Sequence, residues 1–204
     1  MTAASSSGRS ASTSELSNGG ARPSATHVAL IRGINVGGKN PVPMAGLRAA
    51  LEAVGFTAVR TYIQSGNVLL ASKTGDEAKV AARVEAVLES EFGVTTVVVA
   101  ITAATLRRAV ADAPKGFGSK PDTYHYDAAF LHPQVAVADA VAAFGIRDGV
   151  DTVWPGNGVV YFRRLSAERV HSKMNRVVGT VPYKHMTIRN WRTTTTLLAM
   201  LDED

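Results

Sequence analysis

Residues 27–72 carry the strongest structural signals of this chain, and they read HVALIRGINVGGKNPVPMAGLRAALEAVGFTAVRTYIQSGNVLLAS. The continuous apolar run 28–31 is typical of a buried strand, and helical spacing then predicts a helix through four apolar residues, Met44, Leu47, Leu51 and Val54. Between them, residues 33–40 form a loop with three glycines, two asparagines and a lysine. Loops held by a rigid scaffold commonly carry function, so this loop is the first candidate for a binding surface.

The pattern continues as a ferredoxin-like subdomain. Alternating side chains, β-branched runs and one more helical stripe predict strands at 57–64, 67–72 and 95–101 and a helix at 80–92. Ser65-Gly66 supplies the turn between the first two of these strands. The order strand–helix–strand–strand–helix–strand is the ferredoxin-like unit, and we assign it to residues 27–101.

This topology makes a prediction about two loops. The first and second strands run parallel, with the third strand inserted between them and antiparallel to both. The loop 33–40 and the turn 64–67 therefore open at the same end of the sheet. We expect them to be neighbours in space.

Residues 102–204 are predicted to form a second α+β subdomain that partly repeats the first. Its expected elements are helices at 102–113, 135–144 and 188–201, a strand at 124–131, and a hairpin that joins 152–154 to 159–165. Four consecutive threonines at 193–196 are poor helix formers. The last helix therefore needs tertiary packing, which we expect through Trp191, Leu198 and Leu201.

Residues 1–26 are predicted to be a disordered tail. They contain eight serines, three glycines, one leucine and no aromatic residue, which is too little apolar surface to offset the entropy of ordering. Arg9 and Arg22 are thin support for a transit peptide, and we interpret the segment as a plain tail. The chain has no cysteine and no apolar run long enough for a membrane span, so we expect a cytoplasmic protein.

Positive charge is concentrated near the C-terminus. Residues 163–192 hold eight basic residues and one acid, a net charge of +7, so the rest of the chain carries −2 of the total +5. This asymmetry indicates an anionic partner, either a phosphate-bearing small molecule or a nucleic acid. The alternative is a solvated basic face that only aids solubility.

Gly33-Ile-Asn-Val-Gly-Gly-Lys-Asn40 nearly matches the Walker A pattern of nucleotide-binding proteins. Asn40 stands where a hydroxyl should bind magnesium, and Pro41 and Pro43 disrupt the helix start that should receive the phosphates. We therefore do not predict a P-loop. Backbone amides of the loop could still bind an anion that Lys39 neutralises; the alternative is a loop whose glycines only supply positive φ.

A second motif, Thr187-Ile-Arg-Asn-Trp-Arg-Thr193, is predicted to begin the last helix. Cations are unfavourable at a helix N-terminus, so Arg189 and Arg192 there suggest a bound anion or an acidic partner. The simpler alternative is capping by Thr187 or Asn190 with Trp191 in the core.

The sequence shows few signs of a metal site or of an RNA-recognition motif. The five histidines show no metal-ligand spacing, and we predict neither a metal nor a cofactor. The strand 67–72 carries no stacking aromatic residue, so the RNA-recognition signature is absent.

The two motifs, in this order and at this separation, resemble the bacterial domain-of-unknown-function family numbered 1697. Its stretch LRGINVGGxNxVxMxxL is similar to residues 31–47, and its TYIQSGN is reproduced at 61–67. Its C-terminal TxRNWNT corresponds to 187–193, where Arg192 replaces asparagine. The resemblance covers about residues 27–201 and implies a two-subdomain α+β fold with a ferredoxin-like first half. It implies no activity.

The leading hypothesis is a binding protein for a phosphate-bearing ligand. Its expected site combines cations and polar side chains from both motifs and the basic segment: Arg32, Asn35, Lys39, Asn40, Gln64, Ser65, Asn67, Lys173, Arg189, Asn190 and Arg192. An enzyme acting on a small anionic metabolite is the competing hypothesis, and a ligand-free interaction module is the third. Convergence of the two motifs on one pocket would favour a site.

Overall fold

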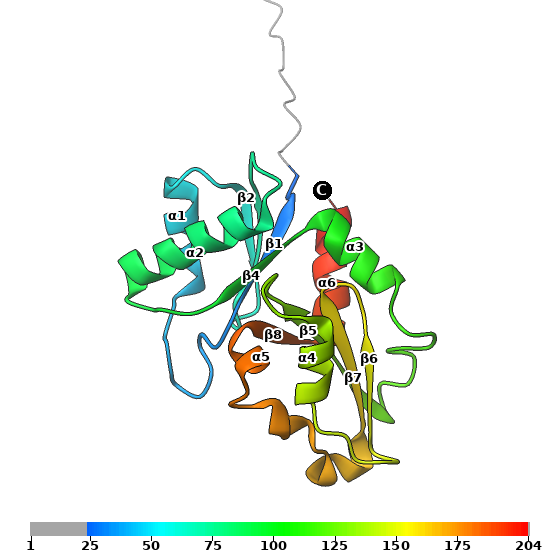
Figure 1. Ribbon diagram of the computed structural model, residues 1–204. Coiled ribbons are helices and arrows are strands. Elements are labelled where there is room, and N and C mark those ends of the chain that lie inside the picture. The colour runs from blue at the N-terminus through cyan, green and yellow to red at the C-terminus, as the bar shows by residue number, and fades with distance from the viewer. Residues whose placement is uncertain (1–23, 204) are drawn as a thin grey trace, which may run out of the picture.

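The computed structural model describes residues 24–203 and has a mixed α+β fold with two four-stranded antiparallel sheets (Figure 1). The first sheet has the strand order β2-β3-β1-β4. Its strands are β1 (His27–Ile31), β2 (Thr57–Tyr62), β3 (Asn67–Ala71) and β4 (Val98–Thr102). Its helices are α1 (Met44–Ala53) and α2 (Glu77–Phe92), and α3 (Ala103–Ala111) follows β4 directly. The predicted ferredoxin-like order of the first half is confirmed.

The second sheet has the corresponding order β6-β7-β5-β8. Its strands are β5 (Tyr124–Leu131), β6 (Asp151–Pro155), β7 (Val159–Leu165) and β8 (Met186–Asn190). Its helices are α4 (Val137–Ala143), α5 (Val181–Lys184) and α6 (Trp191–Asp202), and two 3-10 segments, η1 (Ser166–His171) and η2 (Met174–Val177), lie between β7 and α5. These 3-10 segments and α5 stand where the first half has the long helix α2.

The two halves are a structural repeat. The N–H of the last residue of β1, Ile31, donates to the carbonyl of Gly66, and the N–H of the last residue of β5, Leu131, donates to that of Gly158. The following residues match as well, because Arg32 donates to Val97 and His132 donates to His185. In each case the acceptor immediately precedes the neighbouring strand. The predicted partial repeat therefore extends to individual backbone hydrogen bonds.

The final strand of each half leads directly into a helix with a side-chain cap. The Thr102 hydroxyl accepts from the N–H of Thr105 at the start of α3, and the Asn190 amide oxygen accepts from the N–H of Arg192 at the start of α6. Such caps satisfy backbone donors that the helix cannot pair itself. The turn from strand to helix is thus encoded locally in both halves.

Three clusters of buried apolar side chains hold the sheets and helices together. Helices α1 and α2 cover the outer face of the first sheet, and α4 with η2 and α5 covers the outer face of the second. The two inner faces turn toward each other and share a core with α3 and α6. Both helices therefore lie where the two halves meet, and the sites between the halves are built on them.

One element differs from the sequence expectation. A helix was expected from about residue 188, but Met186–Asn190 form the edge strand β8, and α6 begins only at Trp191. β8 pairs with β5, and Ala128 lies opposite Arg189. Pairing with a distant strand overrides the local signal, which is common for short segments. Similarly, β4 begins at Val98 rather than at residue 95.

Most of the predicted tail, residues 1–23, lies outside the described residues. Ala25 is buried in the core between the halves, and Thr26 donates its N–H to the Leu70 carbonyl. Ala25 and Thr26 thus belong to the fold, although the tail was predicted to extend to residue 26. Among residues 24–203 no helix combines the length and apolarity needed to cross a bilayer.

Candidate functional site

The glycine-rich loop after β1 is a tight hairpin. Val36 and Lys39 face each other across a bridge, and the two residues between them, Gly37 and Gly38, have φ values of 57° and 73°. A two-residue turn with both central residues at positive φ is of the I′ type, which favours glycine. No helix starts at the Gly38-Lys39 pair, because α1 begins at Met44. The loop is therefore not a P-loop.

Asn35 joins this loop to the hairpin between β2 and β3. Its side-chain nitrogen donates to the carbonyls of Val42 and Gln64, both at 2.9 Å, and its oxygen accepts from the Val42 N–H at 2.8 Å. These bonds confirm that loop 33–40 and turn 64–67 are neighbours. The Asn35 amide therefore holds the backbone of both loops in place, and Gln64 takes part in this contact through its backbone carbonyl.

Gly66 is required by the close approach of this turn to β1. Its φ is +81°, and a Cβ atom there would lie 2.9 Å from both the Cβ and the carbonyl oxygen of Ile31. Only glycine combines this backbone conformation with so little space. The Ser65-Gly66-Asn67 motif is thus explained by packing.

Arg189 docks the second half onto this end of the first sheet. It is 8% exposed, and its side chain donates six hydrogen bonds, to Asn67 Oδ1 (2.5 Å), Thr187 Oγ1 (2.6 Å) and the carbonyls of Ile31 (2.7 Å), Ile188 (3.0 Å), Ser65 (3.1 Å) and Gly66 (3.1 Å). A guanidinium carries five N–H donors, so these acceptors saturate it. Arg189 was expected to contact a ligand; in the structure its donors are used within the protein.

The position of Arg189 also corrects the argument from the helix dipole. Arg189 belongs to β8, one residue before the capping residue of α6, and its guanidinium bonds to the first half rather than to the start of the helix. Burial lowers the pKa of Arg189 to about 10, so the side chain stays positively charged at neutral pH. Its acceptors are carbonyl, amide and hydroxyl oxygens, and no carboxylate of the described residues bonds to it. The charge therefore remains uncompensated beside the loops that it holds.

These loops and β8 enclose an open groove of about 1110 Å³. Its walls come from both halves of the repeat, and its lining residues are Arg32, Gly33, Val36, Lys39, Asn40, Ile63, Ser65, Glu85, Thr95, Thr96, Val97, Tyr183, Met186, Thr187, Ile188, Arg189, Asn190 and Thr193. The two sequence motifs thus converge on one groove, as the hypothesis of a single pocket required.

The groove is positively charged. Arg32, Lys39 and Arg189 contribute three cations, against the single carboxylate of Glu85. One oxygen of Glu85 accepts from the Val98 N–H at 2.8 Å, which ties that side chain to the start of β4. A cleft lined by one sign of charge attracts counter-ions, here anions.

Two of the three cations have donors to spare. The guanidinium of Arg32 lies over the ring of Tyr183, 4.6 Å from its centroid, and makes no hydrogen bond within residues 24–203. Lys39 is exposed at the loop and is likewise unpaired among these residues. Arg32 and Lys39 are therefore the side chains of the groove that can bind an anion directly.

Six of the eleven predicted site residues line the groove: Arg32, Lys39, Asn40, Ser65, Arg189 and Asn190. Asn35, Gln64 and Asn67 are not part of the lining, and their hydrogen bonds hold the loops that form its walls. Arg192 is exposed beside it, one residue before Thr193. Lys173 is not part of the lining; its N–H donates to Asp151, and it belongs to the segment drawn at the bottom of Figure 1.

The basic segment 163–192 does not form one continuous surface. Arg163 stacks on the rings of Tyr124 and Trp154, and Arg164 pairs with Asp127. Its charge is thus divided between structural contacts and the groove. Only a fraction of the net +7 is available to one ligand.

Several lining residues carried no signal in the sequence. Glu85 is one of many polar residues on α2, and Ile63 and Tyr183 look like ordinary strand and helix residues. Ile63 has a φ of 48° and is 51% exposed, which is uncommon for a β-branched residue. Among the described residues no group of three or more histidine, aspartate or glutamate side chains could bind a metal ion.

Trp191 fixes the approach of α6. It packs edge-on against Phe117, with ring centroids 4.9 Å apart, and a Cβ atom on Gly118 would lie 2.4 Å from its ring. The ring is partly rather than fully buried. Trp191 thus anchors α6, as expected, but its side chain lies at the margin of the shared core.

Comparisons with known proteins agree with this fold. A family model for proteins of unknown function, DUF1697, matches residues 25–161. The chain is also similar to the solved structure of the conserved bacterial protein SP0830 from Streptococcus pneumoniae, with a TM-score of 0.73 and 25% sequence identity over 88% of this chain and 99% of that one. No curated protein matches the sequence significantly.

Proposed function

The chain belongs to DUF1697, a family of proteins of unknown function, and from its groove we propose that it binds a small phosphate-bearing ligand. The observation that carries this proposal is the excess of cations in the lining. The lining contains three cations, Arg32, Lys39 and Arg189, and one carboxylate. Both sequence motifs contribute residues to this groove.

The donors of the groove suit phosphate oxygens. Arg32 and Lys39 supply charged N–H groups, which form the stronger class of hydrogen bond to an anion. Gly33 also lines the groove, and its N–H makes no hydrogen bond within the described part of the chain. Arg189 adds an uncompensated positive charge without offering a donor. A phosphate between Arg32, Lys39 and Gly33 would satisfy all three.

The lining has few groups that could act in acid–base catalysis, which favours a binding protein over an enzyme. Glu85 is its single carboxylate, and one of its oxygens is held by the backbone of β4. General acid–base catalysis needs a group positioned for proton transfer. We therefore rank a binding protein ahead of an enzyme, and we expect it in the cytoplasm, where phosphate-bearing metabolites are abundant.

Single-stranded nucleic acid is the second candidate. Arg192 is exposed next to the lining residue Thr193, so positive charge continues past the rim of the groove. A polymer could use that extension in addition to the groove, whereas a phosphate bound in the groove does not need it. The two candidates therefore differ in how much they depend on Arg192.

The test is calorimetric titration at low salt with inorganic phosphate, nucleoside mono- and triphosphates, and a short single-stranded RNA. We expect saturable binding of at least one phosphate compound, weakened about tenfold or more by Lys39→Ala or Arg32→Ala. Lys120→Ala is the matched control, since Lys120 is exposed and outside the lining. Absence of binding for every phosphate compound would reject the proposal. Loss of RNA binding alone in Arg192→Ala would select the nucleic acid.

A further inference from the structure

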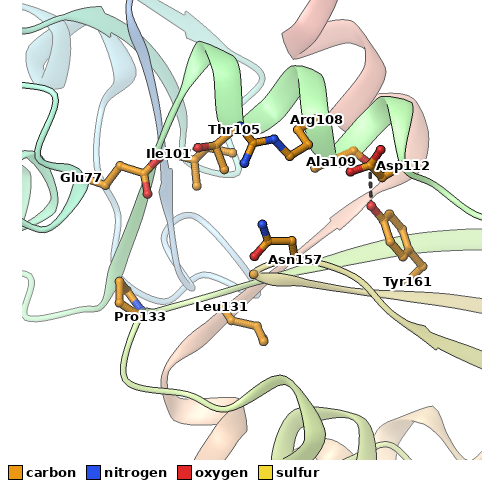
Figure 2. Close-up of a pocket in the computed structure, with 11 residues that line it drawn as sticks. Glu77, Ile101, Thr105, Arg108, Ala109, Asp112, Leu131, Pro133, Asn157 and Tyr161 are labelled. Carbon is orange, nitrogen blue, oxygen red and sulfur yellow. Dashed lines mark hydrogen bonds between the residues drawn. The ribbon is translucent and has the colours of Figure 1, made fainter.

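The repeat has a second pocket at the position that corresponds to the groove. A cavity of about 220 Å³ lies between the two halves (Figure 2). Its lining residues are Glu77, Ile101, Thr105, Arg108, Ala109, Asp112, Leu131, Pro133, Asn157, Gly158 and Tyr161. It is smaller than the roughly 300–1,000 Å³ typical of pockets for drug-sized ligands, so it suits a small metabolite.

The correspondence with the groove holds element by element. The groove uses the residues after β1, the β2–β3 turn, and β8 with the start of α6. The cavity uses the residues after β5, the β6–β7 turn, and β4 with α3. Thr193 of the groove and Thr105 of the cavity are each the third residue of their helix. Each half thus contributes one such pocket, completed by the other half.

The chemistry of the two pockets has diverged. Ile101 stands in β4 where Arg189 stands in β8, each one residue before the capping residue of the next helix. The cavity therefore lacks the buried guanidinium that fills and charges the groove. Its own charged groups are Glu77, Arg108 and Asp112, a net charge of −1.

Figure 2 shows these three charges in one row, with Glu77 of α2 at one end, then Arg108 of α3, and Asp112 at the C-terminal end of α3. Glu77 Oε1 accepts from the Thr105 hydroxyl at 2.8 Å, which places this carboxylate at the level of Thr105. Thr105, Arg108 and Asp112 are spaced by three and four residues, so they share one helix face. At 1.5 Å per residue, the row spans about 10 Å from Thr105 to Asp112. The order is negative, positive, negative.

Glu77 is partly used within the protein, because its Oε1 also accepts from the Thr102 N–H at 2.6 Å, which leaves its second carboxylate oxygen for a ligand. The other polar groups of this row are available. Arg108 and Asp112 are four residues apart but form no ion pair, and within residues 24–203 neither their side chains nor that of Asn157 makes a hydrogen bond. Figure 2 shows Asn157 reaching from the β6–β7 turn toward α3, opposite this row. The floor is closed by Tyr161, whose hydroxyl donates to the Ala109 carbonyl at 2.6 Å. Burial, helped by the charge of Asp112, raises the pKa of Tyr161 to about 12, so the floor is polar and uncharged.

We propose that this cavity binds a basic amino acid, such as free lysine or arginine. The α-carboxylate would bind Arg108, the α-ammonium Asp112, and the side-chain cation Glu77. The charges then alternate in the right order, and the ligand's net +1 balances the −1 of the cavity. This site is separate from the groove, and it does not depend on what the groove binds.

Calorimetric titration of the full chain with free lysine and free arginine tests the assignment. We expect one saturable site, weakened about tenfold or more in Asp112→Asn and in Arg108→Gln, as for loss of a charged hydrogen-bond partner. Asp122→Asn is the matched control, because Asp122 is exposed and outside the cavity. Lys39→Ala should leave this binding unchanged, since it alters only the groove.

Two analogues separate the contributions of the ligand's charged groups. Norleucine lacks the side-chain cation and should bind about tenfold or more weakly than lysine, and Nα-acetyl-lysine should lose affinity because it lacks the α-ammonium. Equal binding of lysine and norleucine would overturn the proposal. So would the absence of binding by lysine and arginine at millimolar concentration, or an equal loss in Lys39→Ala and Asp112→Asn.

Discussion

Arg189 and Asn67 lie 122 residues apart in sequence, and Nε of Arg189 donates to Oδ1 of Asn67 at 2.5 Å. Asn67 is itself held by donating to the Tyr62 carbonyl and the Ser65 hydroxyl. The contact therefore joins the edge strand of the second half to the hairpin of the first. Both walls of the groove depend on this buried pair.

Replacing Arg189 should be costly for folding. Arg189→Ala removes donors from six acceptors, several of them buried, and we expect a loss of about 3 kcal/mol or more in the free energy of unfolding. Urea denaturation measures it. Arg192→Ala, which removes an exposed arginine three residues away, should change the value by about 0.5 kcal/mol or less. Similar effects for the two variants would refute the docking role of Arg189.

Gly66→Ala tests the close approach of the hairpin to β1. It combines a positive φ with a Cβ atom 2.9 Å from Ile31, and we expect a loss of about 2–3 kcal/mol. Gly55 has a φ of +92° with open space around it, so Gly55→Ala isolates the backbone strain at about 1 kcal/mol. The difference between the denaturation midpoints of the two variants separates the cost of crowding from the cost of backbone strain. An equal effect would show that crowding at Gly66 relaxes freely.

Acid should destabilise the protein through His27. Burial lowers the pKa of His27 from its usual 6.5, partly opposed by the charge of Glu77. The folded state therefore binds this proton less readily than the unfolded state, so the stabilisation is present above pH 6.5 and is lost as the pH falls below it. Unfolding midpoints measured from pH 7.5 to 5 should decline less in His27→Gln. An unchanged decline would assign the acid sensitivity to other groups.

If RNA binds in the groove, its salt dependence should be shallow. Arg32 and Lys39 in the groove and Arg192 beside it give three contacts to a single strand, which predicts a slope of log K against log salt of about −2.1. Use of all eight basic residues of segment 163–192 would give about −5.6. Fluorescence anisotropy with a labelled oligonucleotide over a range of salt concentrations distinguishes the two. A steep slope would move the binding surface away from the groove.

Truncation tests how much Ala25 and Thr26 contribute to stability. Thr26 donates its N–H to Leu70, and its carbonyl and hydroxyl accept from the N–H groups of Ala103 and Ser72. A chain that begins at His27 should therefore be about 2–3 kcal/mol less stable than one that begins at Ser24. Thermal melts of the two chains make the comparison. Equal midpoints would show that Ala25 and Thr26 are dispensable.

Periodicity and turn chemistry were enough to predict the first half and the neighbourhood of its two loops. The apolar run 28–31, the helical stripe from Met44 and the Ser65-Gly66 turn are local signals, and each is read from adjacent residues. Strand order then follows from the ferredoxin-like topology, because few connections satisfy that sequence of elements. The convergence of both motifs on one groove extends that reasoning to the second half.

The role of each side chain depended on contacts that no local pattern contains. Arg189 resembled a surface cation, but pairing of β8 with β5 turns it inward, where carbonyls 123 to 158 residues away take up its donors. Lys173 lay in the same basic run and was placed elsewhere by its bond to Asp151. Charge and polarity are properties of residues, whereas burial and hydrogen-bond partners are properties of pairs brought together by folding. For that reason the sequence identified the two motifs and part of the groove's lining, and tertiary packing determined which cations can reach a ligand.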